Sequence, residues 1–213
     1  MPSVFINYRT VDAVDTAVLF DRELCRRFGP DAIFLAGRSI PAGEKFEPLI
    51  LQSVRRCAVL LVLIGPRWLD APGVNGGRAI DDPKDWVRRE IVEAMRNGVT
   101  VMPVLLNRAR VARDDLPSAI ADLASYQQLT YGHRTTDDDL ARLAKELSRA
   151  VPGLRRAEKT GKASSGAATG PRPEVPPGSQ VFRGNNFLGA TTVGIAVAGD
   201  LHLGDAEAGD DDD

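Results

Sequence analysis

An uninterrupted apolar run at residues 58–64, AVLLVLI, constrains the fold of this chain more than any other segment. The run has the length of a β-strand and is far too short to cross a bilayer. A strand without polar residues must be covered on both faces, which is typical of a parallel sheet flanked by helices. The sequence therefore predicts an α/β domain with 58–64 as an inner strand.

Strand-like and helix-like segments alternate around this run. Helices are indicated where apolar residues recur every three or four positions, and strands where short apolar runs end at glycine, proline or polar residues. Five strands alternating with helices predict a doubly wound, flavodoxin-like, mostly parallel sheet. The expected strands are 4–6, 32–36, 58–64, 99–106 and 126–130, and the expected helices are 12–28, 46–57, 85–97 and 136–151.

Two local features refine these expectations. Pro103 cannot donate a ladder hydrogen bond, so strand 99–106 is expected near an edge of the sheet or with a bulge. Thr136 is expected to cap the last helix, and the aspartates that follow it favour the positive end of the helix dipole.

The composition changes after the last helix. Residues 153–180 are rich in Gly, Ser, Ala, Pro and Lys and are expected to form a flexible, disordered linker. Residues 181–213 form a short, β-prone tail in which glycine recurs every fifth position, and the tail ends in the acidic run 210–213. The domain boundaries expected are thus 1–152, 153–180 and 181–213.

Charge and cysteine content limit the setting in which the chain works. The formal net charge is −2, so no overall field favours binding to nucleic acid or to anionic membranes. The two cysteines, Cys25 and Cys57, fall in helical patterns rather than in a disulfide framework, and the N-terminus lacks the layout of a signal peptide. We expect reduced thiols, a cytoplasmic location, and neither nucleic-acid nor membrane partners.

Several familiar catalytic sites have no counterpart in the sequence. Gly161 and Lys162 lack the upstream glycine of a phosphate-binding loop, and no serine lies in a G-x-S-x-G motif. His133 and His202 have no cysteine or carboxylate at a spacing suited to a metal. We therefore expect no metal and no bound cofactor.

The expected helix 85–97 carries one pair with catalytic potential. Trp86 and Glu90 are four residues apart, so their side chains leave the same helix face about 5–6 Å apart. The helix begins at the carboxyl edge of the sheet, where ligands of doubly wound sheets bind, beside Tyr8, Arg9 and the loop 37–43. A tryptophan packed under a helix beside a surface glutamate is a common structural arrangement, so the spacing alone favours packing over a functional role.

Four segments in succession resemble the Toll/interleukin-1 receptor (TIR) domain, in its bacterial branch. They are VFINYR at 4–9, GRSIPAGE at 37–44, LIGPRWL at 63–69, and the W-x-x-x-E pair Trp86 and Glu90, and the resemblance covers residues 3 to about 152. It implies the TIR fold and, by similarity to bacterial members, cleavage of NAD⁺ at the nicotinamide–ribose bond. Glu90 is then the catalytic residue, and Trp86, Tyr8, Arg9 and Ser39 are the residues expected to bind NAD⁺, which is a substrate rather than a cofactor.

A single carboxylate suffices for this chemistry. Most glycosidases need an acid to protonate the leaving group and a second carboxylate opposite it. Nicotinamide in NAD⁺ is already a pyridinium cation and departs neutral without a proton. The remaining task is to stabilise an oxocarbenium-like ribose, which a preorganised carboxylate does.

The sequence alone leaves alternatives to this interpretation open. The domain is either an NAD⁺-cleaving effector triggered by homotypic TIR–TIR assembly or a non-catalytic adaptor that recruits other TIR domains. A nucleoside-processing enzyme of similar architecture fits the motifs less well. The tail is either plainly disordered or, by resemblance to bacterial amyloid-like signalling motifs, a self-assembling segment that a partner protein shares.

Overall fold

The computed structural model describes residues 2–40, 46–74, 76–107, 111–132 and 134–154. Within them, five strands form one sheet in the order β2-β1-β3-β4-β5, and every neighbouring pair is parallel. The strands are β1 (Val4–Asn7), β2 (Ile33–Phe34), β3 (Val59–Ile64), β4 (Thr100–Leu106) and β5 (Leu129–Tyr131). The doubly wound, flavodoxin-like α/β fold is confirmed, and the apolar run forms its central strand.

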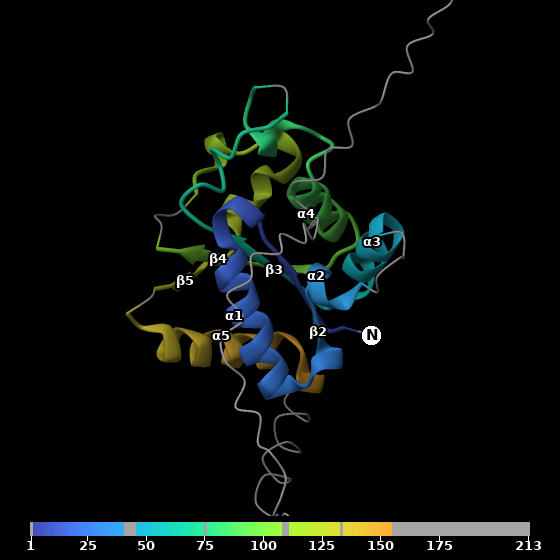
Figure 1. Cartoon of the computed structure of the whole chain (residues 1–213), viewed down its shortest axis with the longest axis vertical. Coiled ribbons are helices and arrows are strands. Elements are labelled where there is room, and N and C mark those ends of the chain that lie inside the picture. The colour runs from blue at the N-terminus through green and yellow to red at the C-terminus, as the bar shows by residue number, and fades with distance from the viewer. Residues whose placement is uncertain (1, 41–45, 75, 108–110, 133, 155–213) are drawn as a thin grey trace, which may run out of the picture.

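Helices cover both faces of this sheet (Figure 1). The α-helices are α1 (Thr10–Phe28), α2 (Ala36–Ser39), α3 (Phe46–Arg56), α4 (Trp86–Arg96) and α5 (Thr136–Ala150), and the longest 3-10 segment is η4 (Ser118–Ser125). Because successive strand residues point to opposite faces, the sheet separates two cores. Phe5 and Leu60 pack with α3, α4 and η4, whereas Ile6 and Leu61 pack with α1 and α5.

The carboxyl end of β3 is fixed against α1. The carboxylate of Asp12 accepts hydrogen bonds from the backbone N–H groups of Gly65 (2.8 Å) and Arg67 (2.7 Å). A side chain at position 65 would displace the Asp12 carboxylate, because its Cβ would collide with the two carboxylate oxygens. This contact holds the start of the 65–85 loop at the edge of the sheet where ligands bind in such folds.

The second strand is shorter than the sequence predicts. Only Ile33–Phe34 pair with β1, and Ala36–Ser39 turn into a short helix instead of continuing strand 32–36. Polar side chains stabilise this turn: the Ser39 hydroxyl accepts from the Leu35 N–H (3.1 Å), and the Arg38 guanidinium donates to Asp21. Such local hydrogen bonds offer the backbone an alternative to the strand ladder.

Strand β4 explains how Pro103 is tolerated. β4 lies next to the edge strand, as expected, and its register with β3 runs from Thr100 to Leu105 without a bulge. β5 pairs only with Val104–Leu106, so at Pro103 the described sheet has a neighbouring strand on one side only. Pro103 therefore lies before the part of β4 that pairs with β5, where its lack of an N–H costs no hydrogen bond to β5.

The last strand and helix differ slightly from expectation. β5 occupies Leu129–Tyr131 rather than 126–130. The N-cap of α5 is Thr135, not Thr136, and it makes no side-chain capping bond. Its hydroxyl instead donates to Asp139 (2.6 Å), which also accepts from the Gly132 N–H.

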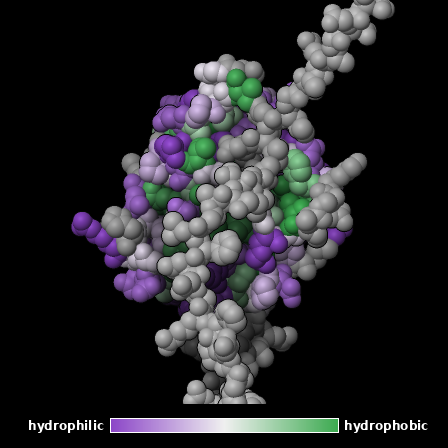
Figure 2. All heavy atoms as spheres, viewed as in Figure 1, coloured by the Kyte–Doolittle hydropathy of each residue, from purple (hydrophilic) through white to green (hydrophobic). Residues whose placement is uncertain are grey.

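The described surface is mixed in character, with hydrophilic residues separated by small hydrophobic patches, one of them over α3 (Figure 2). In the described part of the chain, no helix has both the length and the apolar character that crossing a membrane requires. Leu154, the last described residue, is buried against the α1–α5 core. The rest of the predicted linker, the tail, His133, His202 and loop residues 41–43 lie outside the described residues.

Candidate active site at the carboxyl edge of the sheet

The first turn of α4 is fixed by its N-cap. The Oδ1 atom of Asp85 accepts a hydrogen bond from the backbone N–H of Arg88 (2.9 Å), which satisfies a donor that has no partner within the helix. From this cap, Trp86, Val87 and Glu90 follow on the inward face of the helix, where all three are buried. The cap therefore sets the position from which the W-x-x-x-E pair enters the site.

Glu90 is buried, not at the surface. Its side chain is 3% exposed, and its Oε2 accepts a hydrogen bond from Nδ2 of Asn7 at 2.7 Å. Asn7 is the last residue of β1 and also donates from Nδ2 to the backbone carbonyl of Val87 (3.3 Å). The carboxyl group is thus held between the carboxyl end of β1 and the second turn of α4.

Burial raises the pKa of Glu90 from an ordinary 4.5 to about 8. The largest cause is the loss of hydration, which disfavours the charged form. The hydrogen bond from Asn7 and the charge of Arg89 lower the pKa, whereas the charge of Asp85 raises it. A buried carboxyl group with so perturbed a pKa is characteristic of functional sites.

A buried ion pair lies next to this carboxyl group. The guanidinium of Arg9 binds both carboxylate oxygens of Asp85, at 2.9 and 3.0 Å, and the two side chains are 1% and 4% exposed. Asp85 is therefore both the cap of α4 and the partner of Arg9. The pair ties the loop after β1 to the start of α4.

Trp86 lies beneath two covering side chains. The Arg89 guanidinium stacks on its ring at 3.9 Å from the centroid, and the Phe46 ring meets it edge-on, with centroids 5.6 Å apart. Arg89 is also 3.8 Å from Glu47 of α3. The tryptophan is 5% exposed in this conformation.

Comparison with known proteins identifies the family. A family model described as "TIR domain" matches residues 4–145, about two thirds of the chain. The chain belongs to the TIR domain family. The match spans the sheet, helices α1 to α4, the first part of α5 and every residue of the site described above.

This TIR domain is also similar to part of a much longer protein. It is 26% identical over 147 residues to the zebrafish (Danio rerio) protein "NAD(+) hydrolase SARM1", covering 68% of this chain and 19% of that protein. The chain thus spans about a fifth of the relative's length. Similar solved structures include the TIR domains of the activated Roq1 resistosome (12% identity, TM-score 0.42, 75% of this chain and 84% of that chain) and a TIR-STING receptor from C. gigas (21%, 0.44, 66% and 39%).

The remaining residues expected to bind NAD⁺ take different positions in the TIR domain. Tyr8 is buried in the core on the α1–α5 side of the sheet, whereas Trp86 packs on the α3–α4 side. Ser39 lies at the end of α2, and its hydroxyl is engaged with the Leu35 N–H. The structure therefore brings Arg9, Trp86 and Glu90 to one place and leaves Tyr8 and Ser39 in separate surroundings.

Two residues of this site, Asn7 and Asp85, were not singled out from the sequence. Asn7 stands at the end of an apolar strand, where a polar residue marks the point at which the chain leaves the sheet. Asp85 directly precedes the helix, and a capping interpretation was available from its position alone. Their contacts with Glu90 and Arg9 span 83 and 76 residues, and no local pattern reports such distances.

Thiol and metal chemistry find no support in the described TIR domain. Burial raises the pKa of Cys25 to about 11 and that of Cys57 to about 12, so neither is a thiolate at neutral pH. Across the described ranges, no cluster of His, Cys, Asp and Glu has the arrangement of a metal site.

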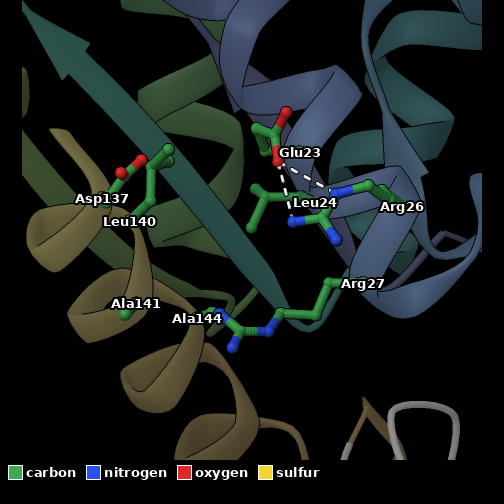
Figure 3. A pocket seen from close by; sticks show the side chains of 8 residues that line it. All are labelled: Glu23, Leu24, Arg26, Arg27, Asp137, Leu140, Ala141 and Ala144. Carbon is green, nitrogen blue, oxygen red and sulfur yellow. Dashed lines mark hydrogen bonds and ion pairs between the residues drawn. The ribbon is translucent and has the colours of Figure 1, made fainter. Parts of the chain in front are cut away.

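A cavity of about 240 Å³ lies between α1 and α5, on the other side of the sheet from α4 (Figure 3). Leu24, Leu140 and Ala144 contribute apolar surface, and Glu23 at its rim is paired with Arg26 (3.0 Å). It contains none of the W-x-x-x-E residues. A second hollow of about 310 Å³ runs along the outer face of α4, with Arg88, Arg89 and Arg96 among its lining residues.

Proposed function

We propose that this TIR domain is an NAD⁺ glycohydrolase that cleaves the nicotinamide–ribose bond, with Glu90 as its catalytic residue. The observation that carries the proposal is the environment of Glu90: a buried carboxyl group, raised in pKa and held by one amide at the ligand-binding edge of the sheet. The family and the similarity to a protein named as an NAD(+) hydrolase support the same substrate.

The proposed reaction uses a carboxylate to stabilise positive charge. As the bond between ribose C1′ and nicotinamide N1 breaks, its electron pair goes to N1 and nicotinamide leaves as a neutral molecule. The ribose carries the positive charge as an oxocarbenium-like species, which water attacks with loss of one proton. A carboxylate at Glu90 stabilises that charge, and removing such a group slows catalysis by about 10²–10³-fold.

The substrate itself promotes the ionised form of Glu90. A pKa of about 8 leaves the carboxyl group mostly protonated at neutral pH in the free protein. A pyridinium cation within about 4–6 Å favours the carboxylate and lowers the pKa. Binding of NAD⁺ therefore releases a proton from Glu90 and generates the charge that the reaction needs.

Access to Glu90 requires a rearrangement at Trp86. In the described conformation, Phe46 and Arg89 cover the Trp86 ring, and Glu90 is nearly inaccessible. Displacing Arg89 frees a face of Trp86 for stacking on a base of NAD⁺. Arg9 is committed to Asp85, so its proposed part in NAD⁺ binding is to hold the start of α4, and Tyr8 and Ser39 remain candidates for contacts in the rearranged site.

The closed conformation also supports a second candidate function. A TIR domain whose glutamate stays buried and protonated would act as a non-catalytic adaptor that recruits other TIR domains. The burial of Glu90 at 3% exposure is the observation that favours this alternative. The two functions differ in whether assembly exposes the glutamate.

At the level of the whole chain, we propose an assembly-triggered immune or signalling effector acting in the cytoplasm. Homotypic TIR–TIR contacts bring the domains together, residues 153–180 serve as a flexible linker, and residues 181–213 serve as the assembly segment. A partner protein carrying a similar segment would act as the trigger. The β-branched residues and regular glycines of the tail support this arrangement.

Replacement of Glu90 tests the proposed activity. We expect Glu90→Gln to lower NAD⁺ cleavage by concentrated full-length protein about 10²-fold or more, because the amide cannot carry the stabilising charge. Glu93→Gln is the matched control: Glu93 lies on the same helix, but it pairs with Arg55 outside the site. Equal activity of Glu90→Gln and wild type would reject the assignment, and no cleavage by any of the three proteins would favour the adaptor.

A further inference from the structure

The structure assigns to Asn7 a role beyond packing: we propose that its amide is the positioning group that holds Glu90 in its catalytic orientation and favours its ionised form. The inference rests on the proposed function of Glu90 but concerns a different residue. Asn7 comes from β1 and Glu90 from α4, so this contact couples the sheet to the catalytic helix.

The geometry places the Asn7 amide where it fixes the carboxyl group. Asn7 is 0% exposed, and its backbone is fixed by the register that pairs it with Val62 of β3. From this central position its Nδ2 donates to Glu90 at 2.7 Å and to the carbonyl of Val87 at 3.3 Å. Two acceptors one helical turn apart thus define the direction of the amide relative to α4.

The other end of the amide supplies a second, independent observation. Within the described part of the chain, Oδ1 of Asn7 is buried and has no hydrogen-bond partner. Buried polar atoms in folded proteins are nearly always paired, so this oxygen is a free acceptor beside the carboxyl group. The hydrogen bonds that orient the Asn7 side chain are therefore those that its Nδ2 donates to Glu90 and Val87.

Asn7 affects the ionisation of Glu90 in a different way from the charged groups around it. Asp85 on the same helix disfavours the carboxylate, Arg89 favours it, and Arg9 from the loop after β1 is paired with Asp85. Asn7 is the neutral donor facing Glu90 from the sheet, and its hydrogen bond favours the charged form. Without this hydrogen bond, burial would raise the pKa of Glu90 further.

The test measures the ionisation of Glu90 directly. In full-length protein labelled with ¹³C at the glutamate carboxyl groups, NMR titration reports the Glu90 pKa in wild type, Asn7→Ala and Asn7→Asp. We expect Asn7→Ala to raise the pKa of Glu90 by about one unit, the size of a lost hydrogen bond to a charged group. The pH limb of kcat/KM for NAD⁺ should move by the same amount, giving about tenfold lower activity at neutral pH.

Asn97→Ala is the matched control, because Asn97 donates from its amide to Glu93 (3.0 Å) on the same helix but at an exposed position. We expect it to leave the pKa of Glu90 unchanged. Asn7→Asp preserves the size of the side chain and carries the test if Asn7→Ala does not fold, since two adjacent carboxyl groups raise the upper pKa of the pair.

The two proposals fail in different ways. An unchanged Glu90 pKa in the folded Asn7 variants overturns the role of Asn7, whether or not the protein cleaves NAD⁺. A wild-type protein without NAD⁺ cleavage overturns the proposed function, while the titration still shows whether Asn7 controls Glu90.

Discussion

At the residue scale, Glu90 is held in a state that favours its neutral form. Its raised pKa means that the folded protein retains a proton that the unfolded chain, with an ordinary pKa of 4.5, has already lost. The folded state then binds more protons than the unfolded state between about pH 4.5 and pH 8. Glu90 therefore contributes its full stabilisation below pH 4.5 and loses it as the pH rises through about 8.

Comparison of wild type with Glu90→Gln isolates this contribution, because glutamine resembles the neutral acid. We expect the two proteins to be similar in free energy of unfolding near the acid end of the window. As the pH rises, the free energy of unfolding of the wild type should decrease relative to that of the variant, by at most about 1.4 kcal/mol per pH unit. Urea unfolding at several pH values measures the difference.

Glu93, on the exposed face of the same helix, should contribute to stability with the opposite pH dependence. The hydrogen bond from Arg55 lowers the pKa of Glu93, so any stabilisation by Glu93 is lost as the pH falls rather than as it rises.

A difference between wild type and Glu90→Gln that does not change with pH would show that Glu90 is ionised, and therefore hydrated, in the folded protein.

The sequence singles out Glu90 as a candidate but does not predict its surroundings. Its spacing from Trp86 places both on one helix face, yet periodicity does not say whether a charged residue on that face is buried. Its hydrogen-bond partner Asn7 lies 83 positions away in sequence and reaches Glu90 from β1, an inner strand of the sheet.

At the scale of elements, the Arg9–Asp85 pair joins β1 to α4. Removing one partner leaves the other as an unpaired buried charge, which typically costs about 3–5 kcal/mol. We expect Arg9→Met and Asp85→Asn each to lower the free energy of unfolding strongly, even though asparagine retains the capping oxygen. The double variant should be clearly more stable than the sum of the two losses predicts, as measured by a double-mutant cycle in urea.

An exposed ion pair within the same domain is the control for this cycle. Arg113 and Asp122 form a contact of 2.9 Å with side chains 60% and 73% exposed, so their coupling should be small. If the Arg9 and Asp85 losses are simply additive, the pair does not join the two elements energetically.

Element positions were predictable where burial alone decides them. The run 58–64 became the central strand because an apolar strand is most stable between two helix layers. Strand 32–36 was overestimated because side-chain hydrogen bonds of Arg38 and Ser39 redirect the chain, and such bonds depend on partners, including Asp21, that a local pattern does not contain.

At the scale of the whole molecule, the proposed assembly segment connects self-association to catalysis. Residues 181–204 combine β-branched side chains with regular glycines and few large residues, so a monomeric core is not expected. Pairing with identical copies would satisfy every backbone group in a cross-β arrangement. Clustering through the linker would raise the local concentration of the TIR domains to roughly the millimolar range.

A peptide of residues 178–206 tests this part of the account. We expect it to form fibrils with a cross-β diffraction signature, and we expect Val193→Asp to prevent them because a charge repeats in every layer of the stack. In the full-length protein the same substitution should lower NAD⁺ cleavage at low protein concentration. A peptide that stays monomeric at high concentration and high salt would assign the tail to disorder.

The central claim is that ionised Glu90 performs the cleavage, and the pH dependence of kcat/KM for NAD⁺ tests it most directly, because kcat/KM reports the groups of the free enzyme. For the full-length protein we predict that kcat/KM rises about tenfold per pH unit up to the Glu90 pKa of about 8 and is constant above that pH. The corresponding limb of kcat should lie at lower pH, because the bound pyridinium favours the carboxylate. A kcat/KM that is constant from about pH 6 to about pH 9, or that keeps its limb in Glu90→Gln, would contradict the claim.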